Sequence, residues 1–136
     1  MKRNIYNDLL IWKSNSEHKP LVLLGARQVG KTYIVKQFGA NEFDIFLYVN
    51  CHNNPFVEGL FVDFNIDRIL YQLQQAYETK IVPGKTLLFF DEIQEVDNGI
   101  PSLKYFCEEV RDLHVVVAGS LLGISLREDE SYPVGK

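Results

Sequence analysis

The chain has 136 residues, enough for a single domain that buries roughly two-thirds of the surface of its unfolded state. Its hydrophobic fraction of 46% and charged fraction of 24% are ordinary for globular proteins, which excludes wholesale disorder. The net charge of −4 provides no overall positive field, so direct contact with nucleic acid or an anionic membrane is not supported.

The N-terminal part of the chain predicts one helix and one strand. Residues 4–13 carry apolar side chains at helical spacing, and the polar residues 14–20 are typical of a loop. Four consecutive aliphatic residues, Leu21 to Leu24, then suit a strand buried on both faces. We therefore assign residues 1–20 to an N-terminal helix and linker, and residues 21–136 to the core of the domain.

Strands and helices alternate along the rest of the chain. A helix follows the first strand, with Gly39 as its expected C-cap, and a later helix has Ser102 as a candidate N-cap. The further predicted elements are strands at 45–49, 86–90 and 115–118, and helices at 63–77 and from 102 to about Leu113. This alternation predicts an α/β fold in which helices cover both sides of a parallel sheet.

The two cysteines do not indicate a metal site. Neither Cys51 nor Cys107 has the close Cys or His spacing of a zinc site. Cys107 falls in a helical apolar pattern and is expected to be a packed thiol. Cys51 and His52 share a polar loop, where we expect ordinary surface residues, with a ligand contact as the alternative. No apolar run approaches the roughly 20 residues of a membrane span, and no signal peptide precedes the first helix, so we expect a cytoplasmic protein.

The most specific motif lies between the first strand and the following helix. The run GARQVGKT matches G-x-x-x-x-G-K-[ST] at every fixed position. Its glycines and backbone N–H groups, with the helix N-terminus, form a cradle for phosphate. Lys31 would reach the β- and γ-phosphates, and the Thr32 hydroxyl would bind Mg²⁺. The candidate nucleotide-binding residues are Gly25, Ala26, Arg27, Gln28, Val29, Gly30, Lys31, Thr32 and Tyr33.

A second motif, LLFFDE, ends the third predicted strand with two acidic residues. Asp91 would lie at the sheet edge where parallel sheets bind ligands, and there it could hold the hydration shell of Mg²⁺. Glu92 could orient or deprotonate an attacking water. An acid after a strand is more often solvated, but a complete phosphate motif in the same chain favours the catalytic interpretation. Glu95 and Asp97 are expected to form a solvated acidic turn.

For Ser120 and Arg127, near the C-terminus, the sequence leaves two interpretations open. If the fourth strand lies between the first and the third, the Ser120 hydroxyl points toward the γ-phosphate; otherwise Gly119 and Ser120 form a plain turn. Arg127 could act on the γ-phosphate of a neighbouring subunit in a homo-oligomer, or be a surface residue of an acidic tail.

The segments GARQVGKT, DEIQ and GSLLG together resemble the AAA+ type ATPase domain of a large prokaryotic group of ATPases, over nearly the whole chain. The resemblance implies a P-loop NTPase sandwich of three layers with strand order 5-1-4-3-2, and ATP with Mg²⁺. It implies Lys31 and Thr32 as the Walker A pair, Asp91 and Glu92 as the Walker B pair, and Ser120 in the sensor position. Members of the group continue beyond PVGK into a fifth strand, a lid and a C-terminal domain. The resemblance thus implies that the last strand and lid are missing here and that the C-terminal domain is a partner.

The leading functional hypothesis is ATP binding and Mg²⁺-dependent hydrolysis that drives or regulates a longer parent protein. One alternative is a non-catalytic module in which ATP or ADP occupancy alone regulates a partner. A P-loop kinase is a further alternative, but Asp91 paired with Glu92 suits hydrolysis, and the chain has no arginine-rich lid segment.

Overall fold

Four parallel strands form the central layer of the molecule. The structure is a computed structural model that describes residues 5–25 and 29–120. The strands are β1 (Leu21–Gly25), β2 (Ile45–Asn50), β3 (Thr86–Asp91) and β4 (His114–Ser120). They are arranged in the order β1-β4-β3-β2, and every neighbouring pair is parallel. This order agrees with strands 1-4-3-2 of the sheet that the resemblance implies.

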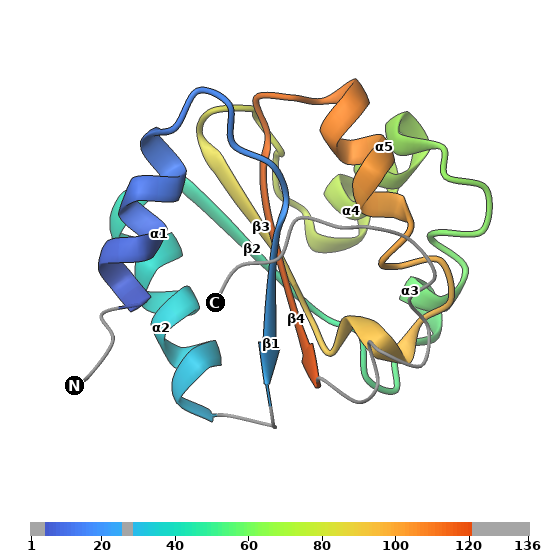
Figure 1. The fold of residues 1–136 in the computed structure, drawn as a ribbon. Helices are drawn as coiled ribbons and strands as arrows, with labels where there is room; N and C mark the ends of the chain where they lie inside the picture. The colour runs from blue at the N-terminus through green and yellow to red at the C-terminus, as the bar shows by residue number, and fades with distance from the viewer. Residues whose placement is uncertain (1–4, 26–28, 121–136) are drawn as a thin grey trace.

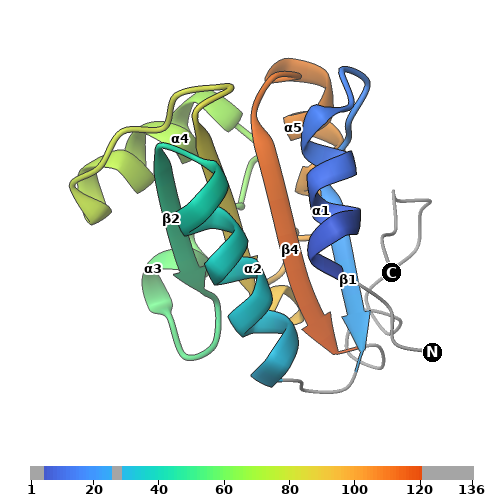
Figure 2. The same ribbon diagram turned by 90° about the vertical axis from the view of Figure 1, so that its left-hand side faces the viewer.

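Helices cover both faces of this sheet, which confirms the predicted α/β architecture (Figures 1 and 2). One face carries α1 (Ile5–Ser14) and α2 (Val29–Glu42). The other carries α3 (Pro55–Glu58), α4 (Ile66–Tyr77) and α5 (Ser102–Glu109), with the short 3₁₀ helix η1 (Ile93–Glu95) after β3. None of the described helices is long and apolar enough to cross a membrane.

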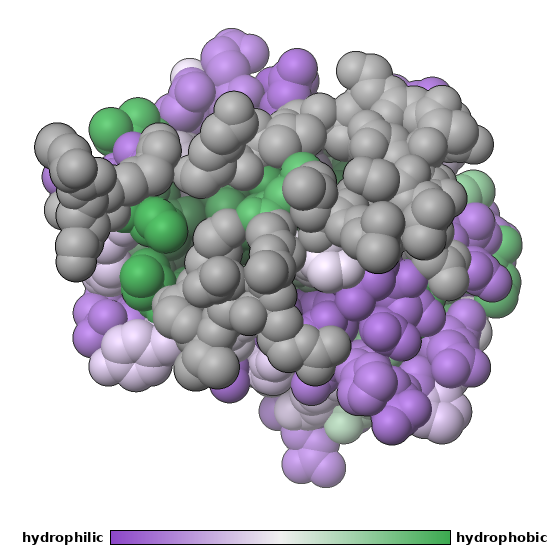
Figure 3. Space-filling view, turned by 60° about the horizontal axis from the view of Figure 1, so that its bottom comes forward, coloured by the Kyte–Doolittle hydropathy of each residue, from purple (hydrophilic) through white to green (hydrophobic). Residues whose placement is uncertain are grey.

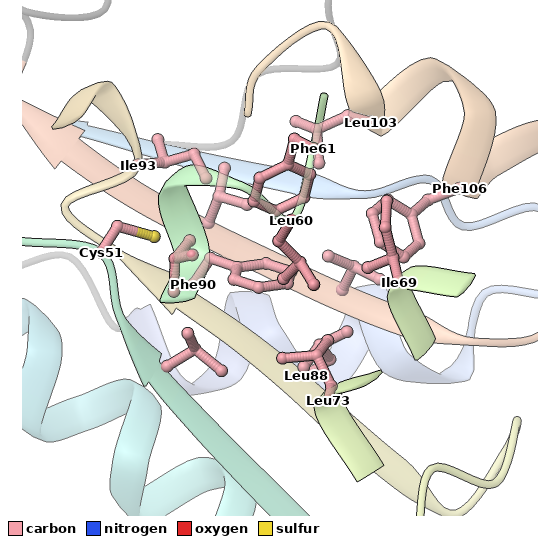
Figure 4. Packing of buried hydrophobic residues seen from close by; sticks show 14 of the residues in the cluster. Cys51, Leu60, Phe61, Ile69, Leu73, Leu88, Phe90, Ile93, Leu103 and Phe106 are labelled. Carbon is pink, nitrogen blue, oxygen red and sulfur yellow. The ribbon is translucent and has the colours of Figure 1, made fainter. Parts of the chain in front are cut away.

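Strand β3 is the most deeply buried element of the sheet, because it lies between two strands and two layers of helices. All six of its residues are buried. Leu88 and Phe90 pack into the cluster beneath α3, α4 and α5, as Figure 4 shows, whereas Leu87 and Phe89 face α1 and α2. This alternation explains the unbroken apolar run, since both faces of a covered parallel strand need apolar side chains. The acid that ends β3 is therefore held on a rigid support.

The prediction that Gly39 caps the end of a helix is wrong. Helix α2 continues past Gly39 to Glu42, and Gly39 is buried inside it. A Cβ atom at this position would overlap the ring of Phe46 on β2. The glycine is required because α2 approaches β2 closely at this point, and not because of its conformational freedom.

Two other helix boundaries also differ from the prediction. Helix α4 begins at Ile66 rather than Asp63, because the side chain of Asn65 accepts a hydrogen bond from Arg68 N at 3.0 Å and caps the helix there. Helix α5 ends at Glu109, short of the predicted end near Leu113. Ser102 is the first residue of α5 and not its N-cap, and its hydroxyl donates to the Gly99 carbonyl at 2.6 Å.

An aromatic cluster fastens α1 to the start of β4. The rings of His18 and His114 stack with centroids 3.8 Å apart, and Trp12 meets both edge-on. His114 Nε2 donates to the Lys13 carbonyl at 3.0 Å, while its buried Nδ1 has no hydrogen-bond partner within residues 5–25 and 29–120. Burial and, to a smaller extent, the neighbouring His18 together lower the pKa of His114 from its ordinary 6.5 to about 4.

Substituting Gly39→Ala tests the close approach of α2 to β2. We expect it to lower the free energy of unfolding in urea by about 1–3 kcal/mol, because the added methyl group displaces Phe46. Alanine stabilises a helix by about 1 kcal/mol relative to glycine, so the destabilisation from displacing Phe46 must be larger than this stabilisation. Gly59→Ala is the matched control, since nothing lies within 4 Å of its added Cβ. Equal stabilities for the two variants would contradict this packing.

The His114 pKa predicts a loss of stability in mild acid. The unfolded chain takes up this proton near pH 6.5 and the folded chain only near pH 4. The free energy of unfolding is therefore unaffected by this group above pH 6.5 and falls between pH 6.5 and 4, by at most about 3 kcal/mol, since each unit of pKa difference is worth about 1.4 kcal/mol. Urea titrations across this range should show that the free energy of unfolding depends less steeply on pH in His114→Phe than in the unaltered chain. Phenylalanine keeps an aromatic ring but cannot be protonated. An unchanged pH dependence in that variant would count against the assignment.

Candidate functional site

Most of the predicted site residues that the structure describes lie together at the carboxyl ends of the strands. Strand β4 lies between β1 and β3, as the interpretation of Ser120 requires, and Gly25 pairs with Ser120 where β1 and β4 end. Figure 3 views the molecule toward this end, and hydrophilic residues cover much of the lower right of that view. Ala26, Arg27, Gln28 and Arg127 lie outside the described part of the chain, and of Gly25, Val29, Gly30 and Lys31 the structure describes the backbone alone.

The carboxylate of Asp91 is the centre of this arrangement. It is 8% exposed and accepts hydrogen bonds on both oxygens. Thr32 Oγ1 donates to Asp91 Oδ2 at 3.3 Å, and the Tyr48 hydroxyl donates to the same oxygen at 2.8 Å. The backbone N–H of Glu92 donates to Oδ1 at 2.9 Å. These donors stabilise a buried carboxylate that would otherwise be costly to remove from water.

The side chains of Thr32 and Asp91 fit a magnesium ion. Both offer hard oxygen ligands, and Mg²⁺ is usually bound by one or two carboxylates together with substrate phosphates and water. Among the side chains that the structure describes, none forms an ion pair with Asp91. The described residues contain no group of three or more His, Cys, Asp or Glu side chains able to hold a metal alone. Thr32 and Asp91 alone would leave most ligand positions of Mg²⁺ open, and phosphate oxygens and water molecules would fill them.

Glu92 is held in a specific position beside Asp91. Its backbone has φ 57° and ψ 45°, the left-handed region, which costs a non-glycine residue roughly 1–2 kcal/mol. Gln94 Nε2 donates to Glu92 Oε1 at 2.9 Å, and Gln94 Oε1 accepts from the backbone N–H of Ser120 at 3.2 Å. Gln94 thus connects the acid after β3 to the end of β4. Backbone strain of this kind is commonly kept at functional sites.

Some predicted residues lie apart from this group, and two members were not predicted. Tyr33 is 61% exposed on α2, and Glu95 is exposed, as expected for an acidic turn. Gln94 was part of the DEIQ motif, which is the only signal that could have singled it out. Tyr48 has no local signal, because its place beside Asp91 depends on the register between β2 and β3.

The expectation that Cys51 is a surface residue is wrong. Cys51 is 1% exposed, packs in the apolar cluster shown in Figure 4, and donates its backbone N–H to the Asp91 carbonyl at 2.9 Å. Burial raises the pKa of its thiol to about 12, and the charge of Asp91 adds to the shift. The thiol is therefore protonated at neutral pH and does not act as a nucleophile. His52 is exposed, as predicted, and Cys107 is partly buried.

The sequence matches one known family. A family model described as an AAA domain covers residues 17–136, which is most of the chain. The matched range begins in the polar segment before β1 and contains the phosphate-binding motif, the two acids after β3 and Ser120. None of the curated proteins gives a significant match.

Proposed function

The chain belongs to the AAA domain family, and on that basis we propose that it binds ATP with Mg²⁺ and hydrolyses it. Membership implies the binding of a nucleoside triphosphate. The proposal adds the choice of ATP, the metal and the hydrolytic step. The observation that carries it is the hydrogen bond between Thr32 and Asp91, two residues 59 positions apart that belong to the phosphate motif and the acidic motif.

Binding is assigned to the start of α2 and the loop before it. The positive end of a helix and its free backbone N–H groups attract phosphate, and Lys31 would add a full charge beside the β- and γ-phosphates. Thr32 and Asp91 would hold Mg²⁺, which neutralises phosphate charge when it is bound. The support for this assignment is the chemistry of the two oxygen donors and the burial of Asp91.

Hydrolysis is assigned to Glu92. Its carboxylate would accept a proton from water while the water oxygen bonds to the γ-phosphorus and the bond to the ADP oxygen breaks. The hydrogen bond from Gln94 engages Oε1 and so orients the carboxylate in advance. Ser120, at the end of β4, would contact the γ-phosphate or report its loss. The link from Gln94 to the Ser120 N–H supports a coupling between the two positions.

The proposed role within a larger protein follows from the resemblance alone. Relatives of this kind carry further segments after the ATPase domain, and nucleotide binding and hydrolysis here would drive or regulate such segments.

Two substitutions separate binding from hydrolysis. Lys31→Ala should weaken ATP binding by more than about tenfold, because it removes the cation expected at the phosphates. Glu92→Gln should keep binding and lower the single-turnover rate by about 10²- to 10³-fold, because an amide cannot accept the proton. Equilibrium dialysis and the release of labelled phosphate, with the chain in excess over ATP, measure the two effects.

The matched control is Glu95→Gln, which neutralises an exposed acid three residues after Glu92, at the end of η1. We expect it to bind and hydrolyse as the unaltered chain does. Unchanged ATP affinity in Lys31→Ala would refute nucleotide binding at this site. An unchanged rate in Glu92→Gln would refute the role of Glu92 and favour a module that only binds ATP.

A further inference from the structure

Of the described side chains that hydrogen-bond to Asp91, Tyr48 makes the shorter contact. Its distance to Asp91 Oδ2 is 2.8 Å, compared with 3.3 Å for Thr32 Oγ1. Tyr48 lies on β2, whose register pairs it with Phe89 and pairs Asn50 with Asp91. Its long side chain therefore reaches along the sheet, on the face that α2 covers, to the acid two positions further on.

Two neighbours hold the ring of Tyr48 in place. The Lys36 ammonium lies over the ring, 4.1 Å from its centroid, and the Phe89 ring lies beside it with centroids 5.4 Å apart. Lys36 is one helical turn after Thr32, so both project from the same side of α2. Because Lys36 and Phe89 both contact the ring, its hydroxyl has a defined position before any ligand binds.

Tyr48 differs in one respect from the other side chain that contacts Asp91. Thr32 is itself a candidate ligand of the metal, whereas the hydroxyl of Tyr48 donates to the carboxylate and is not assigned to the metal. A carboxylate serves a metal well only when its orientation is fixed, and hydrogen-bonding partners outside the ligand set supply that orientation. Tyr48 is the side chain that can do so independently of the nucleotide.

We propose that Tyr48 is a positioning residue for magnesium: its hydroxyl holds the Asp91 carboxylate in the orientation that serves the metal of the nucleotide complex. This inference rests on the proposed function, because it requires a metal at Thr32 and Asp91. It assigns no contact with the nucleotide to Tyr48. Loss of the hydroxyl must therefore affect the contribution of the metal and leave the metal-free affinity for nucleotide unchanged.

The test is Tyr48→Phe, which removes only the hydroxyl oxygen. The dissociation constant of a fluorescent ATP analogue is measured in EDTA and again in saturating Mg²⁺. The value in EDTA divided by the value in Mg²⁺ gives the metal's contribution to affinity. We expect Tyr48→Phe to reduce this ratio by up to about tenfold, the lower end of the range for such outer partners. Tyr71→Phe is the matched control, because Tyr71 is 61% exposed on α4 across the sheet, and its ratio should not change.

Each outcome separates this inference from the proposed function. If the unaltered chain binds the analogue equally with Mg²⁺ and with EDTA, the proposed magnesium site fails and the inference fails with it. If the unaltered chain depends on Mg²⁺ and Tyr48→Phe has the same ratio or a larger one, only the inference is overturned. The inference also fails if Tyr48→Phe weakens binding equally in both conditions, since the hydroxyl would then support the pocket and not the metal.

Discussion

The burial of one carboxylate is the constraint on which the site depends. Asp91 ends a strand whose side chains are all buried, so the sheet and its two helical layers fix where the acid lies. A carboxylate that is 8% exposed needs hydrogen-bond donors to be stable there, and Thr32, Tyr48 and the Glu92 N–H supply them. These donors come from α2, β2 and the turn after β3, so the same interactions that stabilise the acid also assemble the site.

The turn after β3 extends this arrangement toward β4. The left-handed backbone of Glu92 redirects the chain immediately after Asp91, and η1 follows. Gln94 then bridges the Glu92 carboxylate and the N–H of Ser120 through the two ends of one amide. If the proposed roles hold, a displacement of the end of β4 would reach the acid that we assign to hydrolysis through this amide. Such a connection provides a physical route by which the state of the γ-phosphate could be sensed at Ser120 and felt at Glu92.

Local sequence patterns were sufficient for the strands and for the acids. The third strand was predicted to end at Phe90, one residue before its actual end at Asp91. It could be predicted because a parallel strand that is covered on both faces needs continuous apolar residues. Asp91 and Glu92 were found because they directly follow that strand. The order of β1, β4, β3 and β2 came from the resemblance, since periodicity carries no information about which strands are neighbours.

The errors and omissions concern contacts between distant segments. Gly39 looked like a helix terminus, but its role depends on Phe46 in the next strand. Cys51 looked polar from its neighbours, yet it lies beneath α3 and η1 in the core. Tyr48 was missed because its contact with Asp91 exists only once β2 and β3 pair in this register.

The central claim is that Thr32 and Asp91 form the metal end of a nucleotide site. A crystal structure of the chain with a non-hydrolysable ATP analogue and Mn²⁺ tests it most directly, because the anomalous signal of manganese locates the metal. We expect a single strong peak beside Thr32 Oγ1 and on the Asp91 side of the triphosphate, with Tyr48 still donating to Asp91. A metal and triphosphate bound away from Thr32 and Asp91 would contradict it.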